Sequence, residues 1–390
     1  MEEKRLDEVI LDEAIEARAT DIHIDPLIDG YSVRIRVDGK LRLLRSFDKE
    51  AGERLLNQIK ANVGIDSGVI FYPVNEHRKL NYSNRLLDLR VSLVPCISGP
   101  KLSIRILETA NAQQKLSTLG ITDTQTDEMK RWLFDLNGMF MVTGPTGSGK
   151  TTTLYALLHE LVEESRHVVT VEDPVEYEID GINQVEVDLN HGLTFAKGLK
   201  NSLRMDPDCL MVGEISDSET AHEAINAAVM GHVMMATMHS RDAVSTITRL
   251  RDLGLENHQI GAALGVVVNQ RLVGKVCQSC SSKRDITPKE AAFFESRSIK
   301  PPRTTSVASG CSDCSNTVIG GRTGIFEVWN LDTKDYKLIL AGADEDKIRS
   351  RLLETGHISL LANAISKVEA GLISADEVMY TGMSLPWMNK

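Results

Sequence analysis

The sequence contains no run of about 18 consecutive apolar residues, so none of its segments predicts a membrane-spanning helix. Its first residues, Met1-Glu2-Glu3-Lys4-Arg5, lack the apolar stretch of a secretory signal. It also has no excess of positive charge: the net charge of −11 argues against a large nucleic-acid-binding surface. We therefore expect a cytoplasmic protein that does not bind nucleic acid directly.

Cysteine is scarce as well, and the six cysteines fall into two groups. Cys96 and Cys209 stand alone in apolar segments, and we expect both to be buried packing residues. The other four form two C-x-x-C pairs, Cys277 with Cys280 and Cys311 with Cys314. Because a reducing cytosol disfavours disulfides, these pairs indicate a metal site.

Two C-x-x-C pairs suit a tetrahedral Zn²⁺ with four thiolate ligands. The segment between them is charged and contains Pro288, Pro301 and Pro302, as expected of an excursion held at its base by the metal. Since cysteine fills all four ligand positions, we predict a structural site and not a catalytic one. Two unrelated reduced pairs are the alternative; a redox dithiol is disfavoured because no thioredoxin-like pattern surrounds either pair.

The overall composition is that of a soluble globular protein, with 42% hydrophobic and 25% charged residues. A chain of 390 residues is long for one domain, so we expect two to four. Near the C-terminus, apolar residues recur at helical spacing from His357 to Gly371, which predicts a helical region there.

The N-terminal part predicts an α/β domain. Apolar residues at helical spacing from Leu6 to Ala17 indicate an amphipathic helix, and the strict alternation from Tyr31 to Val37 indicates a half-buried antiparallel strand. Two later strands place Arg90 and Arg105 on their polar faces. The pattern alone favours a solvated charged face over a functional role for these arginines. The polar segment Glu108–Thr118 indicates a linker.

The segment Gly144–Thr151 fits the phosphate-binding pattern G-x-x-x-x-G-K-[ST]. An apolar strand, Met139–Val142, precedes it, and a helical stretch follows, which is the context that the motif needs. Glycines allow backbone N–H groups to turn toward an anion, and the helix dipole favours negative charge at the same point. Lys150 would reach the β- and γ-phosphates, and the Thr151 hydroxyl would hold Mg²⁺. The predicted nucleotide-binding residues are Gly144, Pro145, Thr146, Gly147, Ser148, Gly149, Lys150, Thr151 and Thr152.

Short apolar runs alternate with helical stretches from Leu119 to about Gly274, which predicts a mainly parallel sheet covered by helices. Ligands bind at the C-terminal ends of such strands. Glu214 ends one strand, as a Walker-B acid near Mg²⁺ does. Glu172 and Glu176 follow another strand and are candidates for a carboxylate that orients water.

Two histidines, His232 and His239, flank the last of these strands. A lone histidine at a strand end is usually a structural group. Two of them beside a phosphate loop make a sensor of the γ-phosphate an equally good interpretation, and both interpretations stay open.

An ordered set of segments, spread over nearly the whole chain, then matches one family. The segments are Ala19–Pro26, Val33–Gly39, Gly144–Ala156 (Walker A), Glu172–Glu176 (Asp box), Leu203–Ile215 (Walker B), Gly231–His239 (His box), the four paired cysteines and Gly324–Val328. With these motifs the chain resembles the secretion ATPases of type II secretion and type IV pilus assembly.

The resemblance implies an α/β fold with a RecA-like P-loop ATPase core, an N-terminal PAS-like α/β domain, a small zinc-binding insert and a helical C-terminal region. The segments that carry the resemblance do not include the N-terminal membrane-docking domain of most members, so we expect docking to the membrane partner to differ from that of those members. The implied division is 1–107 for the PAS-like domain, 108–118 for the linker, 119–274 for the ATPase core, 275–323 for the zinc-binding subdomain and 324–390 for the helical subdomain.

The resemblance also implies a cytoplasmic homo-hexamer that uses ATP, Mg²⁺ and Zn²⁺. It would work at the inner face of the inner membrane, held there through inner-membrane assembly-platform proteins. Glu176 matches the proposed catalytic glutamate, Glu214 the Walker-B glutamate and His239 the His box. Arg90 and Arg105 match arginines that reach the γ-phosphate, which reverses the preference stated above. Neither arginine has another evident partner in the sequence, which supports the hexamer.

Ser216 stands where the family usually has arginine, and this change predicts weaker coupling between subunits. The leading hypothesis is an ATPase that powers assembly of a pseudopilus or pilus. A pilus retraction ATPase is the near alternative, although that branch usually lacks the four cysteines. A nucleic-acid motor and a nucleotide switch that does not hydrolyse are alternatives of a different class.

Overall fold

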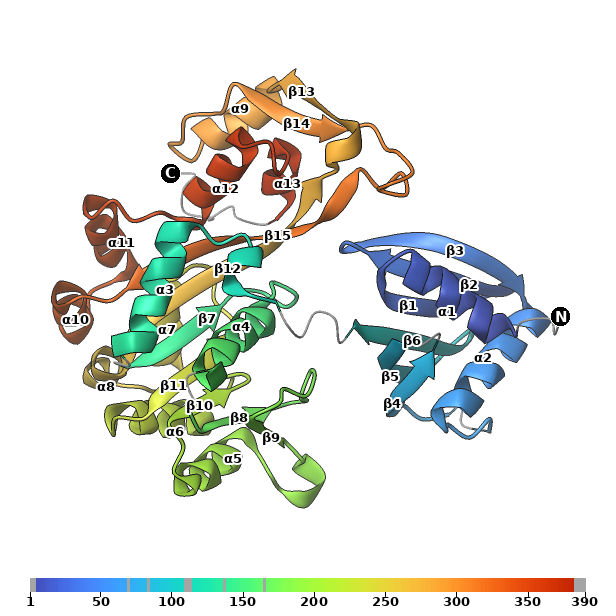
Figure 1. The fold of residues 1–390 in the computed structure, drawn as a ribbon, viewed down its shortest axis with the longest axis horizontal. Helices are drawn as coiled ribbons and strands as arrows, with labels where there is room; N and C mark the ends of the chain where they lie inside the picture. The colour runs from blue at the N-terminus through green and yellow to red at the C-terminus, as the bar shows by residue number, and fades with distance from the viewer. Residues whose placement is uncertain are drawn as a thin grey trace. The chain divides into compact units, whose positions relative to one another are not determined.

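The computed structural model describes residues 5–68, 71–82, 85–108, 114–135, 138–163 and 166–381. The chain forms two compact units, Met1–Asn111 and Ala112–Lys390 (Figure 1). Each unit combines helices with a β-sheet, as predicted. Of the predicted linker 108–118, residues 109–113 lie outside the described residues, and Leu116–Thr118 form a short 3₁₀ turn.

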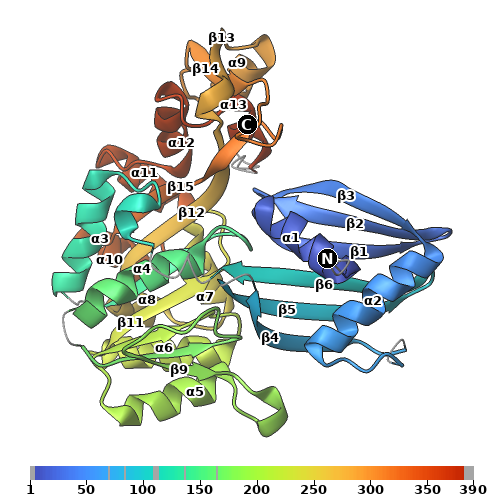
Figure 2. The ribbon, with the colours of Figure 1, turned by 45° about the vertical axis from the view of Figure 1, so that its right-hand side comes forward.

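The first unit is an antiparallel six-stranded sheet with the strand order β3-β2-β1-β6-β5-β4. Helices α1 and α2 lie on the same face of this sheet (Figures 1 and 2), and their apolar residues form one core with the strands. The elements are α1 Leu6–Glu16, β1 Ala19–Leu27, β2 Gly30–Val37, β3 Lys40–Asp48, α2 Lys49–Val63, β4 Val74–Tyr82, β5 Arg85–Cys96 and β6 Gly99–Glu108.

Alternation decides which side chains enter this core. Tyr31, Val33 and Ile35 are buried against the helices, while Arg34 and Arg36 point to the other face, as the period of two requires. The prediction for Cys96 is wrong: it is exposed. It ends β5 at the tip of the β5–β6 hairpin, where its apolar neighbours are exposed as well, so the apolar context did not indicate burial.

The second unit is built on a seven-stranded sheet of order β15-β12-β7-β11-β10-β8-β9. All neighbours run parallel except β15, which pairs antiparallel with β12. This confirms the predicted, mainly parallel sheet. The strands are β7 Met139–Thr143, β8 Val168–Glu172, β9 Ile182–Glu186, β10 Cys209–Val212, β11 Val233–Met238, β12 Leu264–Val276 and β15 Ile319–Asn330.

Helices cover both faces of this sheet, which explains why strands β7, β8, β10 and β11 are buried along their whole length. Helices α3 and α4 pack on one face and α5, α6, α7 and α8 on the other. Cys209 is buried under the first group, as predicted. The bounds are α3 Asp123–Asp135, α4 Lys150–Glu163, α5 Phe195–Ser202, α6 Ser218–Val229, α7 Ser245–Asp252 and α8 Asn257–Ala263.

Most of the remaining elements surround the C-terminal end of β12 and the N-terminal end of β15, which pair with each other. A two-stranded sheet, β13–β14, and helices α9, α12 and α13 lie around the ribbon formed by these two strands (Figure 2), and α10 and α11 pack against the core with α6 to α8. The predicted boundary between residues 323 and 324 falls inside β15. The bounds are β13 Ser281–Asp285, α9 Pro288–Glu295, β14 Thr304–Ala308, α10 Thr333–Leu340, α11 Glu345–Glu354, α12 Leu360–Glu369 and α13 Ala375–Tyr380.

Among the helices that the structure describes, none combines the length and the apolar character that a membrane-spanning helix requires.

Candidate active site

The glycine loop leaves the C-terminal end of β7 and leads directly into α4, which begins at Lys150. At Gly144, where φ is +146°, a Cβ atom would lie 2.5 Å from the carbonyl oxygen of Gln270, so only glycine fits between the loop and β12. At Gly147, where φ is +76°, a Cβ atom would meet nothing within 4 Å. The loop is therefore packed tightly on one side and open on the other.

The open side of the loop fits a phosphate chain. The first turn of α4 presents its backbone N–H groups at the same point, with the positive end of the helix dipole behind them. These residues would hold the phosphates of a nucleotide, and Thr151, the second residue of α4, would supply its hydroxyl to Mg²⁺.

The ammonium group of Lys150 lies against the loop itself. It donates to the carbonyl oxygens of Gly144 at 3.1 Å and Pro145 at 3.3 Å. Burial lowers the pKa of Lys150, and the nearby carboxylate of Glu214 opposes that shift. The two hydrogen bonds place the ammonium group of Lys150 where the phosphates of a bound nucleotide would lie.

His239 and Glu214 reach the same point from two neighbouring strands. Nδ1 of His239 lies 2.9 Å from the carbonyl oxygen of Gly144, and since that oxygen only accepts, Nδ1 carries the proton. The other ring nitrogen, Nε2, lies 3.6 Å from a carboxylate oxygen of Glu214. The Thr237 hydroxyl donates to the Gly213 carbonyl, which fixes the end of β11 to the residue before Glu214. The predicted group of Lys150, Glu214 and His239 is therefore assembled at the loop.

His232 does not belong to this group. It precedes β11, whereas His239 follows it, so the whole strand separates the two histidines. Because β11 runs parallel to β7, only its C-terminal end lies beside the loop. The interpretation in which both histidines flank the phosphates is wrong for His232.

Glu172 is a structural residue and not a carboxylate free to orient water. Its side chain is buried and accepts hydrogen bonds from the hydroxyls of Tyr155 and Thr170 and from the Gln184 amide. Burial raises the pKa of Glu172 and, together with the neighbouring carboxylate, that of Tyr155. The last residue of a fully buried strand points inward, and the sequence did not reveal this.

Glu176 keeps its place among the candidates. It is half-buried in the segment that follows β8, and its backbone makes a hydrogen-bonding contact with the Tyr155 hydroxyl. Tyr155 lies on α4, the helix that starts in the phosphate loop. The segment carrying Glu176 is therefore attached to the helix that carries Lys150, through a tyrosine that the sequence analysis did not single out.

A second group that the sequence analysis missed lies on β12. Asn269 donates to the Thr143 hydroxyl at 2.9 Å, and Arg271 donates to the carbonyl oxygen of Arg241 at 2.7 Å. Gln270 between them contacts the loop. This polar triplet interrupts an otherwise apolar strand, which was the available signal. Its importance depends on β12 lying next to β7, and that neighbourhood is a property of the fold.

Arg90 and Arg105 belong to the first unit, where they are direct partners across β5 and β6. Arg105 also faces Asp21 across β6 and β1, with Nε 3.1 Å from a carboxylate oxygen. The prediction that neither arginine has another partner is therefore wrong for Arg105, and Arg90 is not without a partner either. The predicted contact of both arginines with a γ-phosphate stays a prediction.

The four paired cysteines come together at the ends of β12 and β15. Their sulfur atoms all lie within 4.8 Å of one another. The Sγ–Sγ distances are 3.8 Å for Cys277–Cys311, 3.9 Å for Cys280–Cys314 and 3.8 Å for Cys311–Cys314, all too long for a disulfide. A tetrahedral zinc with bonds of about 2.3 Å requires sulfur atoms about 3.8 Å apart, so these residues fit Zn²⁺.

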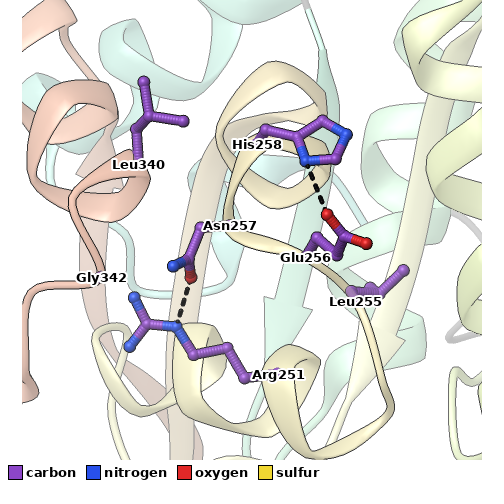
Figure 3. A pocket seen from close by; sticks show the side chains of 7 residues that line it. All are labelled: Arg251, Leu255, Glu256, Asn257, His258, Leu340 and Gly342. Carbon is purple, nitrogen blue, oxygen red and sulfur yellow. Dashed lines mark hydrogen bonds and ion pairs between the residues drawn. The ribbon is translucent and has the colours of Figure 1, made fainter.

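One surface hollow, with a volume of about 600 Å³, lies away from the phosphate loop, between the C-terminal end of α7, α8 and the end of α10 (Figure 3). Within it, Nε of Arg251 donates to Asn257 at 2.8 Å, and His258 lies 3.2 Å from Glu256 (Figure 3). None of the residues predicted for the nucleotide site lines this hollow.

Comparison with known proteins decides the family. Residues 2–380 match the family described as Type II/IV secretion system protein. The chain belongs to this family. It is 38% identical over 375 residues to the type II secretion system ATPase E of Vibrio cholerae, an alignment that covers 96% of the chain and 74% of that protein. It is 35% identical over 379 residues to the type IV pilus assembly ATPase PilB of Acinetobacter baylyi, covering 96% of the chain and 65% of that protein.

Solved structures of ATPases share the fold of this secretion ATPase. The ATPase DotB of Legionella pneumophila superposes with a TM-score of 0.71 at 22% identity, over 97% of this chain and 96% of that one. The pilus retraction motor PilT, solved with bound ADP, superposes with a TM-score of 0.66 at 23% identity, over 98% of both chains. The fold class predicted from the sequence is confirmed, and the chain is a P-loop ATPase.

Proposed function

We propose that this secretion ATPase hydrolyses Mg·ATP at the loop Gly144–Thr151 and that hydrolysis powers assembly of a type II secretion pseudopilus or a type IV pilus. The observation that carries the proposal is the meeting of Lys150, His239 and Glu214 at the C-terminal ends of β7, β11 and β10. The relatives named as type II secretion ATPase E and as PilB support the assembly role.

Each group at the loop has a distinct role in this proposal. Lys150 and the backbone N–H groups from Gly147 to Thr151 bind the phosphates. Thr151 and Glu214 hold Mg²⁺, which neutralises the charge that develops during phosphoryl transfer. Glu176 orients the attacking water and accepts its proton, since Glu172 is engaged with Tyr155 and Thr170.

His239 suits the role of a γ-phosphate sensor because of its two contacts. Its Nδ1–H is shared with the Gly144 carbonyl of the loop, and its Nε2 faces Glu214. If a bound γ-phosphate displaces the imidazole, both contacts change at once. The ring therefore links occupancy of the loop to the carboxylate proposed to hold Mg²⁺.

The cysteine cluster supplies a structural Zn²⁺ site in this proposal. Four thiolates complete a tetrahedral shell and leave no position for water or substrate. The metal would tie the end of β12 to the start of β15, the two strands on which the C-terminal helices pack. The presence of this cluster favours assembly over retraction, since the sequence resemblance associates the cluster with the assembly branch.

We further propose that the enzyme works as a homo-hexamer at the inner face of the inner membrane, bound to assembly-platform proteins. The family and the assembly relatives support this arrangement. Light scattering of the full chain with and without Mg·ATP tests the oligomer. Particles of about six chains support it, and a monomer under all conditions contradicts it.

The proposed activity is tested by measuring phosphate release from Mg·ATP by the full chain, with and without added double-stranded DNA. Hydrolysis that is insensitive to DNA supports the proposal. Strong stimulation by DNA with a steep salt dependence indicates a nucleic-acid motor instead. Tight ATP binding without turnover indicates a nucleotide switch. Cross-linking in the native cells and recovery of an inner-membrane partner tests the assembly role.

A further inference from the structure

Gln270 is a buried residue whose side-chain amide contacts the phosphate loop from the side of β12. It lies on β12, one residue beyond the last pair that β12 forms with β7, and the residue is 2% exposed. Its Nε2 lies 2.7 Å from the carbonyl oxygen of Ser148, and its Oε1 lies 2.8 Å from the hydroxyl of Thr153. One side chain thus bridges the loop and the first turn of α4.

The chemistry of the two partners fixes the orientation of this amide. The Ser148 carbonyl can only accept a hydrogen bond, so the NH₂ group of Gln270 must face it. The oxygen of the amide then faces the Thr153 hydroxyl, which donates to it. Both halves of the amide are satisfied in one orientation only.

The bond to Ser148 also sets the direction of the next N–H group. In a trans peptide the carbonyl oxygen and the following N–H point to opposite sides. A Ser148 carbonyl that is held against β12 therefore turns the N–H of Gly149 away from β12. That direction is toward the open side of the loop, where Gly147 meets nothing within 4 Å.

The loop packs closely against β12, which leaves no space for a side chain at two of its glycines. A Cβ atom on Gly149 would lie 3.2 Å from Nε2 of Gln270, and one on Gly144 would lie 2.5 Å from its carbonyl oxygen. The backbone and the side chain of one residue therefore support the loop at two of its glycines.

We propose that Gln270 is a positioning residue that holds the Ser148–Gly149 peptide in the orientation that binds phosphate. The inference deepens the proposed function and rests on it, because it concerns how the loop binds a nucleotide. The residue does not touch the nucleotide; it acts through the loop. A role limited to packing predicts a loss of stability only, whereas a positioning role predicts a loss of nucleotide affinity in protein that is still folded.

The chain offers a matched control in Gln125. This amide is also 2% exposed, and its NH₂ group also donates to a backbone carbonyl, that of Phe326, at 3.0 Å. It lies on α3, and among the described residues its hydrogen bonds go to Thr122, Phe326 and Asn363 and not to the phosphate loop. Gln125→Glu thus reproduces the burial of a carboxyl group without a change at the loop.

The test is the dissociation constant of Mg·ADP, measured by calorimetry on the full chain, for wild type, Gln270→Glu, Gln270→Met and Gln125→Glu. At about pH 8 a carboxylate at position 270 sets an acceptor against the Ser148 carbonyl, and burial raises the pKa of such a group. We expect Gln270→Glu to bind Mg·ADP about tenfold more weakly than wild type there.

Lowering the pH separates positioning from packing. Once protonated, the carboxyl at position 270 can donate to Ser148 as the amide does, so most of the lost affinity should return at about pH 6. Dividing each value by the wild-type value at the same pH removes the titration of Lys150, His239, Glu214 and the nucleotide. Gln270→Met has no proton to regain, and its loss of affinity should not change with pH.

The outcomes are distinct. Weaker binding by both Gln270 variants, with recovery at low pH for Gln270→Glu alone and wild-type affinity for Gln125→Glu, supports the inference. Affinities within about twofold of wild type for both Gln270 variants, or an equal loss for Gln125→Glu, overturn it. If either Gln270 variant fails to fold, the other decides. Failure of wild type itself to bind Mg·ADP contradicts the proposed function instead.

Discussion

The ammonium of Lys150 lies 3.5 Å from Nδ1 of His239, and both groups bond to one acceptor, the carbonyl oxygen of Gly144. The lysine starts α4, and the histidine follows β11, far along the chain. Their meeting requires that β11 lie beside β7, as it does. Movement of either group therefore disturbs the Gly144 carbonyl oxygen to which the other group is bonded.

This relationship leads to a prediction for His239→Ala. The variant should keep its affinity for Mg·ADP within about threefold, because Lys150 and the backbone N–H groups remain. Its kcat should fall by about tenfold to a hundredfold, since a sensor acts on the reacting γ-phosphate. His232→Ala is the control and should resemble wild type, because His232 lies before β11. Equal defects in both variants would contradict a role specific to His239.

Glu176→Gln should abolish most turnover. A group that orients water and accepts its proton contributes about 10² to 10⁴ in rate, so kcat should fall by that factor with little change in the thermal midpoint. Glu178→Gln, an exposed acid of the same segment, serves as the control and should keep its activity. Rapid hydrolysis by Glu176→Gln would remove this residue from the mechanism.

Glu172→Gln should act on stability instead. The new NH₂ group replaces one of the two carboxyl oxygens and so removes the acceptor of either the Tyr155 hydroxyl or the Thr170 hydroxyl, at a cost of about 1–3 kcal/mol in urea unfolding. Burial raises the pKa of Glu172 above 4.5 in the folded protein. At a pH between the unfolded and the folded pKa, the folded protein therefore binds more protons than the unfolded one. The contribution of Glu172 to the unfolding free energy is then largest below pH 4.5 and falls as the pH rises through the folded pKa.

The pH series provides the check on this assignment. The stability advantage of wild type over Glu172→Gln should shrink as the pH is raised from about 4.5 toward neutrality. An advantage that grows with pH would show that the carboxylate, and not the carboxylic acid, is the form favoured by folding.

The cysteine cluster predicts about one Zn²⁺ per chain in protein prepared without added metal. Cys311→Ser should lose most of this zinc, because one of four thiolates is removed. Cys96→Ser is the matched control: it also removes one thiol, but an exposed one outside the cluster. Elemental analysis decides, and zinc-free wild type or equal zinc in both variants would refute the site.

Arg105→Ala tests the role that the family resemblance assigns to this arginine. Arg105 is exposed, and Asp21 keeps its contacts with Arg36 and the Thr20 hydroxyl, so loss of this ion pair should cost no more than about 1 kcal/mol of stability. If the guanidinium reaches the γ-phosphate, kcat should fall by about 10³. Arg45→Ala, which removes another surface pair of the same unit, is the control. Wild-type turnover in Arg105→Ala would return the arginine to a solvated surface role.

The parts of the structure that could be predicted are those with local signals. The glycine loop has fixed spacing, and alternation of apolar residues defined the strand from Tyr31 to Val37. The spacing of the four cysteines alone predicted their cluster, and their sulfur atoms do lie within 4.8 Å of one another.

The errors concern what lies next to a residue in space. Glu172 and Glu176 looked alike in the sequence, and only the packing of Tyr155 against β8 separates them. Cys96 has apolar neighbours, but the tip of a hairpin exposes all of them. Gln270 contacts the loop only because β12 pairs with β7, and no local sequence pattern encodes that pairing.

The most direct test of the account is phosphate release from Mg·ATP by the full chain for wild type, Lys150→Ala and Lys197→Ala. Lys197 lies on α5 and donates to the carbonyl oxygen of Gly192, which precedes that helix, so Lys197→Ala controls for the loss of one positive charge. We expect turnover by wild type and Lys197→Ala and none above background by Lys150→Ala. Equal turnover by wild type and Lys150→Ala would contradict it.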